Sequence, residues 1–202
     1  MRIKTLTKYI MNKNQIKSDL RKVLLEKKGD SYDYGCVMLY FKISNNVWSS
    51  VQDMIPEDEL YTEEGGVTFG RENDPHITIL FGLHDTISDD TIKDLATNLE
   101  APESITLKDI SIFSNDKYDV VKFDVTGDSK DELSKMNDVF TKQPHTTNFP
   151  DYHPHCTIAY VKAGNGSKYV KTLSKDKEIK IKPNRVIYSK PDGTKKTYNL
   201  KK

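Results

Sequence analysis

Two short segments of the sequence each place a histidine two residues before a threonine. His76 and Thr78 lie in the stretch PHITILF, and His155 and Thr157 lie in the stretch PHCTIAY. The two stretches are 79 residues apart and share Pro, His, Thr and Ile at matching positions. In a β-strand, side chains two residues apart point to the same face, so each stretch offers one imidazole and one hydroxyl to one side.

These residue types fit phosphoester chemistry that needs no metal. An imidazole, with a pKa of ~6.5, can either accept or donate a proton near neutrality. A phosphodiester step uses both roles, because a nucleophile is activated on one side of phosphorus and a leaving oxygen is protonated on the other. Threonine hydroxyls can donate hydrogen bonds to non-bridging oxygens and hold the phosphorus in line. We therefore predict that the catalytic residues are His76, Thr78, His155 and Thr157.

The elements around the two motifs repeat as well, since each motif strand leads into a helix, a strand, a turn and a strand. Periodicity predicts strands over 34–43, 75–81, 105–114, 119–125, 155–161, 178–189 and 195–200, and helices over 47–55, 88–100, 129–143 and 166–174. Ser88 is the expected N-cap of one helix, and Ser129 followed by Glu132 has the capping-box pattern. We expect an α+β fold of two pseudo-symmetric lobes, each an antiparallel sheet with outer helices, flanking a central cleft.

The first part of the chain has a different pattern from the rest. Residues 1–33 predict an N-terminal helical appendage and linker, and residues 34–202 predict the two-lobed domain. With 202 residues, 36% hydrophobic and 30% charged, and with eleven Tyr and seven Phe, the chain has the composition of a folded, soluble protein.

Composition also bears on the compartment. No apolar run approaches the ~20 residues that span a bilayer, and the N-terminus lacks the apolar stretch of a signal peptide. Two cysteines are too few for a disulfide framework or for zinc held by cysteine pairs. We expect a cytoplasmic protein with no membrane partner.

The net charge of +1 is unevenly distributed. Residues 1–33 carry +5, residues 34–161 carry −14 and residues 162–202 carry +10. Such runs are usually solvated faces, although the basic C-terminal segment could line one side of the cleft with lysines. The acidic middle argues against contact with a long duplex, which needs a basic surface.

The paired motifs resemble the signature of the 2H phosphoesterase superfamily, which includes 2′-5′ RNA ligase-like proteins and cyclic phosphodiesterases. The resemblance covers roughly residues 34–200. It implies that the two histidines transfer protons, that the two threonines bind phosphate, and that no cofactor or metal is required. The run GGVTFGRENDPHITILFGLHD and the lysine-rich N-terminus look like 2H proteins of large tailed bacteriophages, some of which degrade the cyclic nucleotide signals of antiviral defence, as anti-CBASS proteins do.

Several residues near the motifs are candidates for substrate binding. Phe69, Phe149 and Tyr152 lie in loops shortly before the motif strands, where an aromatic ring could stack on a base or plug a lobe. We place Tyr160 on the inward face with His155 and Thr157, as a wall of the cleft, and Leu80 at the corresponding face of the first strand. Arg71 could approach a phosphate or form a salt bridge.

The sequence thus predicts a metal-independent phosphodiesterase acting on small 2′,5′- or 3′,5′-linked or cyclic nucleotides, with a monomeric chain as the expected state. One alternative is an RNA-end 2′,3′-cyclic phosphodiesterase or a 2′-5′ RNA ligase, and another is a non-catalytic nucleotide-binding protein. A third is a metal-dependent hydrolase, because His145, Asp151 and His153 are potential zinc ligands near the second motif.

Overall fold

The computed structural model describes residues 32–64, 67–149, 151–173 and 178–200. The predicted N-terminal helix lies outside these residues. In the part of the chain that is described, no helix has the length and apolar character needed to cross a membrane.

Eight strands form one antiparallel sheet in the order β10-β9-β1-β4-β7-β6-β5-β8. Their bounds are β1 (Tyr34–Phe41), β4 (His76–His84), β5 (Ile105–Ser114), β6 (Tyr118–Thr126), β7 (His155–Lys162), β8 (Ile179–Ile181), β9 (Pro183–Ser189) and β10 (Lys195–Asn199). A separate small hairpin consists of β2 (Glu63–Glu64) and β3 (Val67–Thr68). The helices are α2 (Asn45–Gln52), α3 (Asp89–Thr97), α4 (Ser129–Thr141) and α5 (Gly166–Leu173), with a 3₁₀ turn at Glu57–Glu59.

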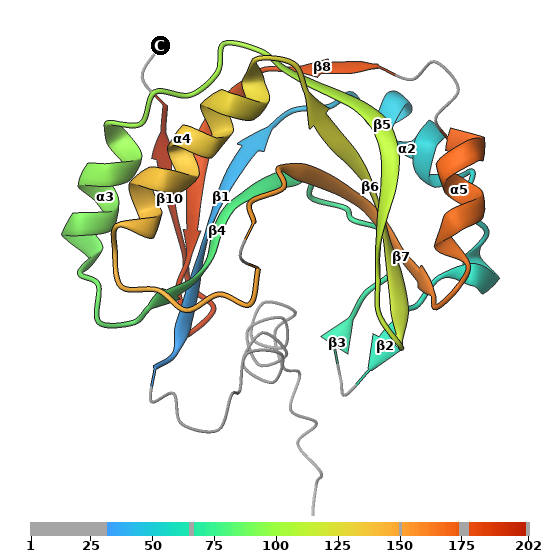
Figure 1. Ribbon diagram of the computed structural model, residues 1–202, viewed down its shortest axis with the longest axis horizontal. Coiled ribbons are helices and arrows are strands. Elements are labelled where there is room, and N and C mark those ends of the chain that lie inside the picture. The colour runs from blue at the N-terminus through green and yellow to red at the C-terminus, as the bar shows by residue number, and fades with distance from the viewer. Residues whose placement is uncertain (1–31, 65–66, 150, 174–177, 201–202) are drawn as a thin grey trace, which may run out of the picture.

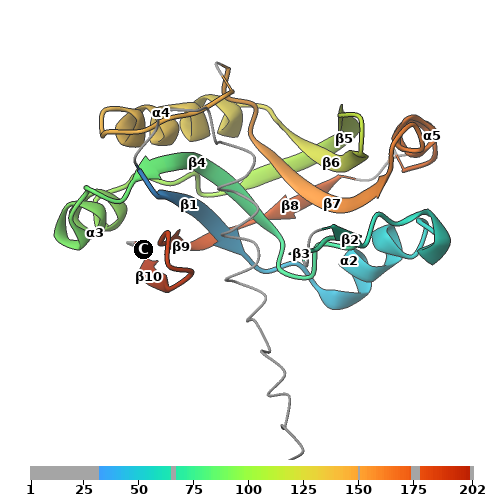
Figure 2. The same cartoon turned by 90° about the horizontal axis from the view of Figure 1, so that it is seen from below.

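The sheet consists of two halves that meet at the two motif strands. β4 and β7 lie side by side in the middle of the sheet (Figures 1 and 2), and the pairing between them is limited to Ile77 and Cys156. The first half contains β10, β9, β1 and β4, and the second contains β7, β6, β5 and β8. These halves are the two lobes that the internal repeat predicted.

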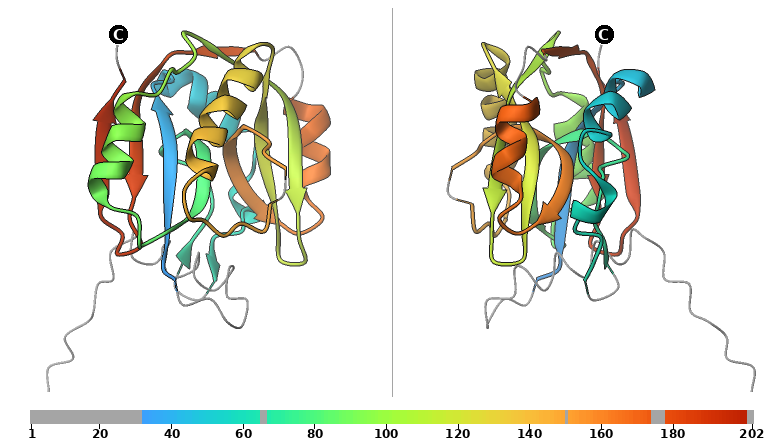
Figure 3. Two further views of the ribbon diagram at one scale, coloured as in Figure 1. Left: turned by 60° about the vertical axis from the view of Figure 1, so that its left-hand side comes forward. Right: turned by 90° about the vertical axis from the view of Figure 1, so that its right-hand side faces the viewer.

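The helices flank the sheet in pairs. α3 contacts β10 and α4 contacts β4, whereas α5 contacts β5 and α2 contacts β7 (Figures 1 and 3). Apolar residues of the helices and of one sheet face form the main core, which includes Trp48, Phe140, Ile77 and Ile158. The core therefore occupies one face of the sheet and leaves the motif histidines on the other.

Most predicted elements are confirmed, and two local predictions are wrong. Ser88 caps α3 by accepting a hydrogen bond from the amide of Thr91 at 3.1 Å, as expected. Ser129 does not form a capping box, because Asp128 is the N-cap of α4 and the Ser129 hydroxyl donates to the carbonyl of Thr126 at 3.1 Å. The single run predicted over 178–189 is divided into β8 and β9, which lie in opposite halves of the sheet.

Candidate active site

The register of the sheet brings the four motif side chains together on one face. β4 and β7 are antiparallel and pair through the residue between His76 and Thr78 and the residue between His155 and Thr157. This pairing sets His76 opposite Thr157 and Thr78 opposite His155. The two histidines are diagonal neighbours, for which a spacing of ~7–8 Å is typical. A tetrahedral phosphoryl group can lie between them.

Both imidazoles are held in the same tautomer. The Nδ1 atom of His76 lies 2.8 Å from the carbonyl oxygen of Asp74, and the Nδ1 atom of His155 lies 2.7 Å from the carbonyl oxygen of His153. A carbonyl oxygen can only accept a hydrogen bond, so Nδ1 carries the proton in both rings. The Nε2 atom is therefore the nitrogen of each ring that can exchange a proton with a substrate.

A proline before each histidine explains why the two arrangements match. Pro75 follows Asp74, and Pro154 follows His153. Proline restricts the preceding residue to an extended conformation, which fixes the direction of its carbonyl group. The repeated Pro-His pair is thus a local device that orients the imidazole as each strand begins.

The surroundings of His155 contain a group of residues that the sequence analysis missed. Lys122 and Asp124 of β6 pair in register with Thr157 and His155, so their side chains share the motif face. The ring of Phe113, on β5, meets the His155 ring edge to face at a centroid distance of 5.0 Å. The available signal was the pair of charged residues at alternate positions in the apolar strand DVVKFDV.

The same surroundings hold His155 in its neutral form. Burial is the main cause that lowers the pKa of His155 to about 4, and the nearby Lys122 and His76 lower it further. The hydrogen bond to the His153 carbonyl and the Asp124 carboxylate act in the opposite direction. At neutral pH the Nε2 atom of His155 therefore has a lone pair available to accept a proton.

His76 has different neighbours. Its ring stacks on Tyr40 of β1, with centroids 5.4 Å apart and an interplanar angle of 20°. Arg185 of β9 lies over the Tyr40 ring, with its guanidinium carbon 5.2 Å from the ring centre. Tyr40 is 2% exposed, so it supports His76 from the side as a buried wall.

A β-bulge follows each motif and corrects the expectation for Leu80. Two consecutive residues of the neighbouring strand pair with Thr78 and Leu80 on β4, so Ile79 has no partner in the register. In the same way, consecutive residues of β6 pair with Thr157 and Ala159 on β7. Leu80 consequently lies in the main core, contrary to its predicted place on the cleft face. Strict alternation would also have turned Tyr160 away from the motif face, and the bulge returns it to that face.

Each bulge leaves a strand carbonyl that a buried carboxamide binds. The Asn137 side chain on α4 donates to the carbonyl of Ile79 at 2.7 Å. The Gln52 side chain on α2 donates to the carbonyl of Ile158 at 3.0 Å, and the amide of Glu72 donates to the same carbonyl at 2.9 Å. The two helices thereby fix the two bulges in equivalent ways.

Two of the predicted substrate-binding residues, Phe69 and Tyr160, belong to an aromatic cluster. Phe69 contacts Tyr61, Tyr118 and Tyr160 with centroid distances of 5.1, 5.2 and 5.1 Å. This packing matches the reading of Phe69 as a hydrophobic plug, and it sets Tyr160 at the wall of the second half of the sheet.

The other two aromatic candidates lie in the loop before β7. The hydroxyl of Tyr152 donates to the carbonyl of Thr78 at 3.0 Å, and its ring packs against the main core. Tyr152 thus ties the loop to the first motif strand, and its ring has the packing of a hydrophobic plug. Phe149 is 70% exposed, which leaves its ring open to a ligand.

Arg71 forms the salt bridge that was the alternative to phosphate binding. Its guanidinium is hydrogen-bonded to the carboxylate of Glu57, to the carbonyl of Ile55 at 2.7 Å and to the carbonyl of Gln52 at 3.3 Å. Arg71 therefore anchors the loop before β4 to the end of α2, and its approach to a phosphate stays a prediction.

The residues considered as metal ligands serve other contacts. The Nδ1 atom of His145 lies 2.9 Å from the carbonyl of Gln143, and His153 supplies the carbonyl that orients His155. Within the described ranges, no three His, Cys, Asp or Glu side chains are grouped so that they could hold a metal ion.

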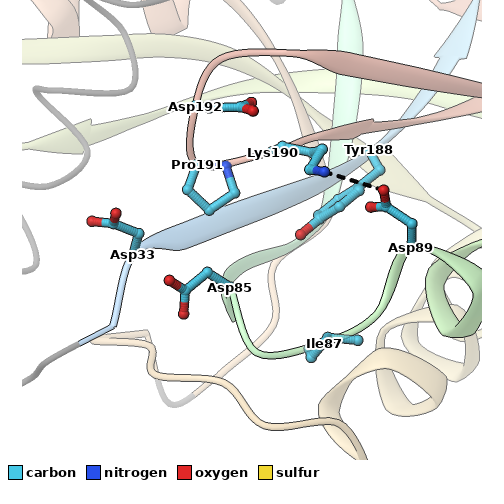
Figure 4. Close-up of a pocket in the computed structure, with 8 residues that line it drawn as sticks. All are labelled: Asp33, Asp85, Ile87, Asp89, Tyr188, Lys190, Pro191 and Asp192. Atoms are coloured by element: carbon cyan, nitrogen blue, oxygen red, sulfur yellow. Dashed lines mark hydrogen bonds and ion pairs between the residues drawn. The ribbon is translucent and has the colours of Figure 1, made fainter.

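A pocket of about 600 Å³ lies away from the motifs, where β1 begins and β9 ends (Figure 4). Its lining includes Asp33, Asp85, Tyr188 and Asp192, and Lys190 there forms an ion pair with Asp89 at 3.1 Å. None of the four motif residues lines it.

Comparisons with known proteins identify the family and the fold. A model of the 2′-5′ RNA ligase superfamily matches residues 46–191, which is more than half of the chain. The structure of Kluyveromyces marxianus Usb1 is similar with a TM-score of 0.53 at 9% identity, covering 84% of this chain and 99% of that one. The same protein with uridine monophosphate gives 0.51 at 8% identity, with 83% and 98% covered. E. coli LigT complexed with 3′-AMP gives 0.46 at 13% identity, with 83% and 96% covered.

No curated protein sequence matches the chain. At these identities the two Usb1 structures establish the fold alone, and the family rests on the family model together with the duplicated motif. The chain belongs to the 2′-5′ RNA ligase superfamily and is a phosphodiesterase of the 2H type.

Proposed function

We propose that this chain hydrolyses small 2′,5′- or 3′,5′-linked or cyclic nucleotides without a metal. The observation that carries the proposal is the matched pair of imidazoles, each with Nδ1 bound to a carbonyl two residues before it. The pair lies diagonally across one sheet face, and a threonine hydroxyl accompanies each ring. This arrangement supplies one proton acceptor, one proton donor and two hydrogen-bond donors for a phosphate.

In the proposed step, His155 is the base and His76 is the acid. The Nε2 atom of His155 takes a proton from water, whose oxygen attacks phosphorus, and the bond from phosphorus to the leaving ribose oxygen breaks. His76 enters the step as an imidazolium with protons on both nitrogens, and its Nε2 atom gives the second proton to that ribose oxygen. The lowered pKa of His155, about 4, favours this direction because the ring is neutral over the physiological range.

Thr78 and Thr157 hold the phosphate during this step. Their hydroxyl groups donate to the non-bridging oxygens, on which negative charge accumulates as the nucleophile attacks. Because each threonine faces the histidine of the other strand, the phosphate is bound across the junction of the two halves. Phe149 and Tyr160 are the proposed contacts for the bases.

The substrate is proposed to be small. Residues 34–161 carry a charge of −14, which opposes binding along a duplex. Uridine monophosphate, which accompanies the K. marxianus Usb1 structure, is a nucleotide of the size we propose. A cyclic di- or trinucleotide, with two or three such units, is also far smaller than a duplex, and its cleavage would give the enzyme a role in phage counter-defence.

The proposed enzyme acts as a monomer in the cytoplasm. All four motif residues come from one chain and meet within one sheet. Cys36 and Cys156 are both buried and neither is in a disulfide, as suits a reducing compartment.

The test is turnover of a panel that contains cyclic dinucleotides, cyclic trinucleotides, 2′,5′-oligoadenylate and a 2′,3′-cyclic nucleotide. Each is incubated in EDTA with the wild-type protein and with the His76→Ala/His155→Ala variant. Cleavage that persists in EDTA and is lost in the variant supports the proposal and identifies the linkage.

Other outcomes favour the alternatives. Cleavage of the 2′,3′-cyclic nucleotide alone would indicate an enzyme of RNA ends. Tight binding with no cleavage would indicate a nucleotide-binding protein, and activity that EDTA abolishes would indicate a metal-dependent hydrolase.

A further inference from the structure

Lys122 is a buried lysine on the same sheet face as the motif histidines. Its side chain is 4% exposed. The Nζ atom lies 2.6 Å from the Asp124 carboxylate, 2.5 Å from the Ser111 hydroxyl and 4.2 Å from the centre of the Phe113 ring. An ammonium group is costly to bury, and three contacts of this kind are what make the burial tolerable.

Lys122 and His155 are connected through two different residues. Asp124 lies directly opposite His155 in the register, and its carboxylate binds Lys122. Phe113 presents its ring to both side chains, one as a cation–π contact and one as an edge contact at 89°. A change at Lys122 therefore alters both the charge and the packing next to the imidazole.

In the other half of the sheet, the position beside the motif threonine is uncharged. There, Thr78 pairs with Met38, which pairs in turn with Ile187. In the second half, Thr157 pairs with Lys122, which pairs with Ser111. The repeat is thus symmetric in its His and Thr residues and asymmetric in what lies beside them.

We propose that Lys122 is a positioning residue that adds to the effect of burial in disfavouring the protonated form of His155, and that fixes the orientation of its ring through Phe113. This inference rests on the proposed function, since it assigns the base of that reaction. A cation next to His155 disfavours a second cation on the ring, and the Asp124 carboxylate favours one. The two charges therefore have opposite effects on the same imidazole.

The groups that face His155 come from several elements. His76 faces it from β4, and Lys122 and Asp124 face it from β6. On β5, Ser111 and Phe113 are uncharged, and Lys108 pairs with Asp124 in the register. Lys108 is half exposed and forms an ion pair with Glu178 at 3.9 Å, so it serves as a matched control for a charge on the same face.

The experiment is an NMR titration of the His155 imidazole in the full chain without substrate. Lys122→Met, which keeps the aliphatic stem, is expected to move the pKa of His155 upward by about one unit or more, as removal of a near charge does. Asp124→Asn is expected to move it downward. Lys122→Arg and Lys108→Met are expected to leave it close to the wild-type value.

Opposite shifts for the two variants support the proposal, because a purely structural role would not reverse the sign. An unchanged titration in folded Lys122→Met, or shifts of the same sign, would overturn it. If Lys122→Met does not fold, the titration of Asp124→Asn is the test. A pKa of His155 that rises or stays unchanged in this variant contradicts the inference. The titration needs no turnover, so it gives an answer even if the nucleotide panel shows no cleavage.

Discussion

His76 and His155 lie in the same motif, have the same tautomer and each bind the carbonyl of the residue two positions before, yet their side-chain neighbours differ. His76 stacks on the buried ring of Tyr40, whereas His155 lies beside Lys122, Asp124 and Phe113. Identical residues in a repeat can thus take different roles, because the proton affinity of an imidazole depends on burial and on nearby charge.

The pH dependence of the rate follows from this difference. Only the neutral form of His155 accepts a proton, and its pKa is about 4. The value of kcat/KM reports the free enzyme. We therefore expect no loss of kcat/KM from protonation of His155 as the pH is lowered from 7 to 5, and a fall below about pH 4. The measurement is kcat/KM across this range with a substrate identified by the panel.

The bound state gives a related expectation. An anionic phosphodiester stabilises the imidazolium form, so binding raises the pKa of His155 and the acid limb of kcat lies at higher pH than that of kcat/KM. A kcat/KM limb near ~6.5, the ordinary value for histidine, would contradict the assignment of His155 as a buried base.

The site residues differ in how far the sequence could predict them. His76, Thr78, His155 and Thr157 were found because the repeat marks them twice. Lys122 was not, since a charged residue in a strand usually faces solvent and nothing in the local pattern shows that a neighbouring strand covers it.

At the scale of elements, the two bulges decide which side chains reach the motif face. Each bulge adds one residue to its strand and restores Phe81 and Tyr160 to that face after Leu80 and Ala159 turn into the core. Sequence periodicity located the strands well, because their apolar residues alternate. It could not locate the bulges, because these depend on Asn137 and Gln52, which come from distant helices.

The bulges predict unequal effects for two similar substitutions. Asn137→Leu leaves the buried carbonyl of Ile79 without its side-chain donor and is expected to lower the free energy of unfolding by about 1–3 kcal/mol. Gln52→Leu is expected to cost less, because the carbonyl of Ile158 keeps the amide of Glu72 at 2.9 Å. Urea denaturation of both variants measures the difference.

Activity measurements on the same two variants give a second readout. Asn137→Leu is also expected to reduce kcat, since the bulge that it destabilises adjoins Thr78. Equal losses of stability in the two variants would show that the Glu72 amide does not compensate for the lost Gln52 donor.

At the scale of the whole molecule, three lysines of the basic C-terminal segment, residues 162–202, form ion pairs with carboxylates of the acidic middle. Lys168 pairs with Glu59, and Lys190 and Lys196 both pair with Asp89. These three lysines therefore do not line the cleft as the charge distribution allowed, and Lys122, a buried lysine at the motif face, comes from the acidic middle.

This distribution predicts weak binding of long nucleic acids. We expect a 20-base-pair RNA duplex to bind with a dissociation constant no tighter than about 10⁻⁴ M at physiological salt, because few phosphates would be neutralised. Fluorescence anisotropy over a range of salt concentrations measures it. Micromolar binding with a steep salt dependence would contradict the small-substrate account.

The most direct test of the two-histidine account compares leaving groups. Two substrates are used, a dinucleotide from the panel and a p-nitrophenyl nucleotide diester, whose leaving phenolate needs no proton. We expect His76→Ala to lose about 10²–10⁴-fold in kcat on the dinucleotide and far less on the nitrophenyl ester, whereas His155→Ala loses activity on both. The reverse pattern, or equal losses for both variants on both substrates, would contradict the assignment of His76 as acid and His155 as base.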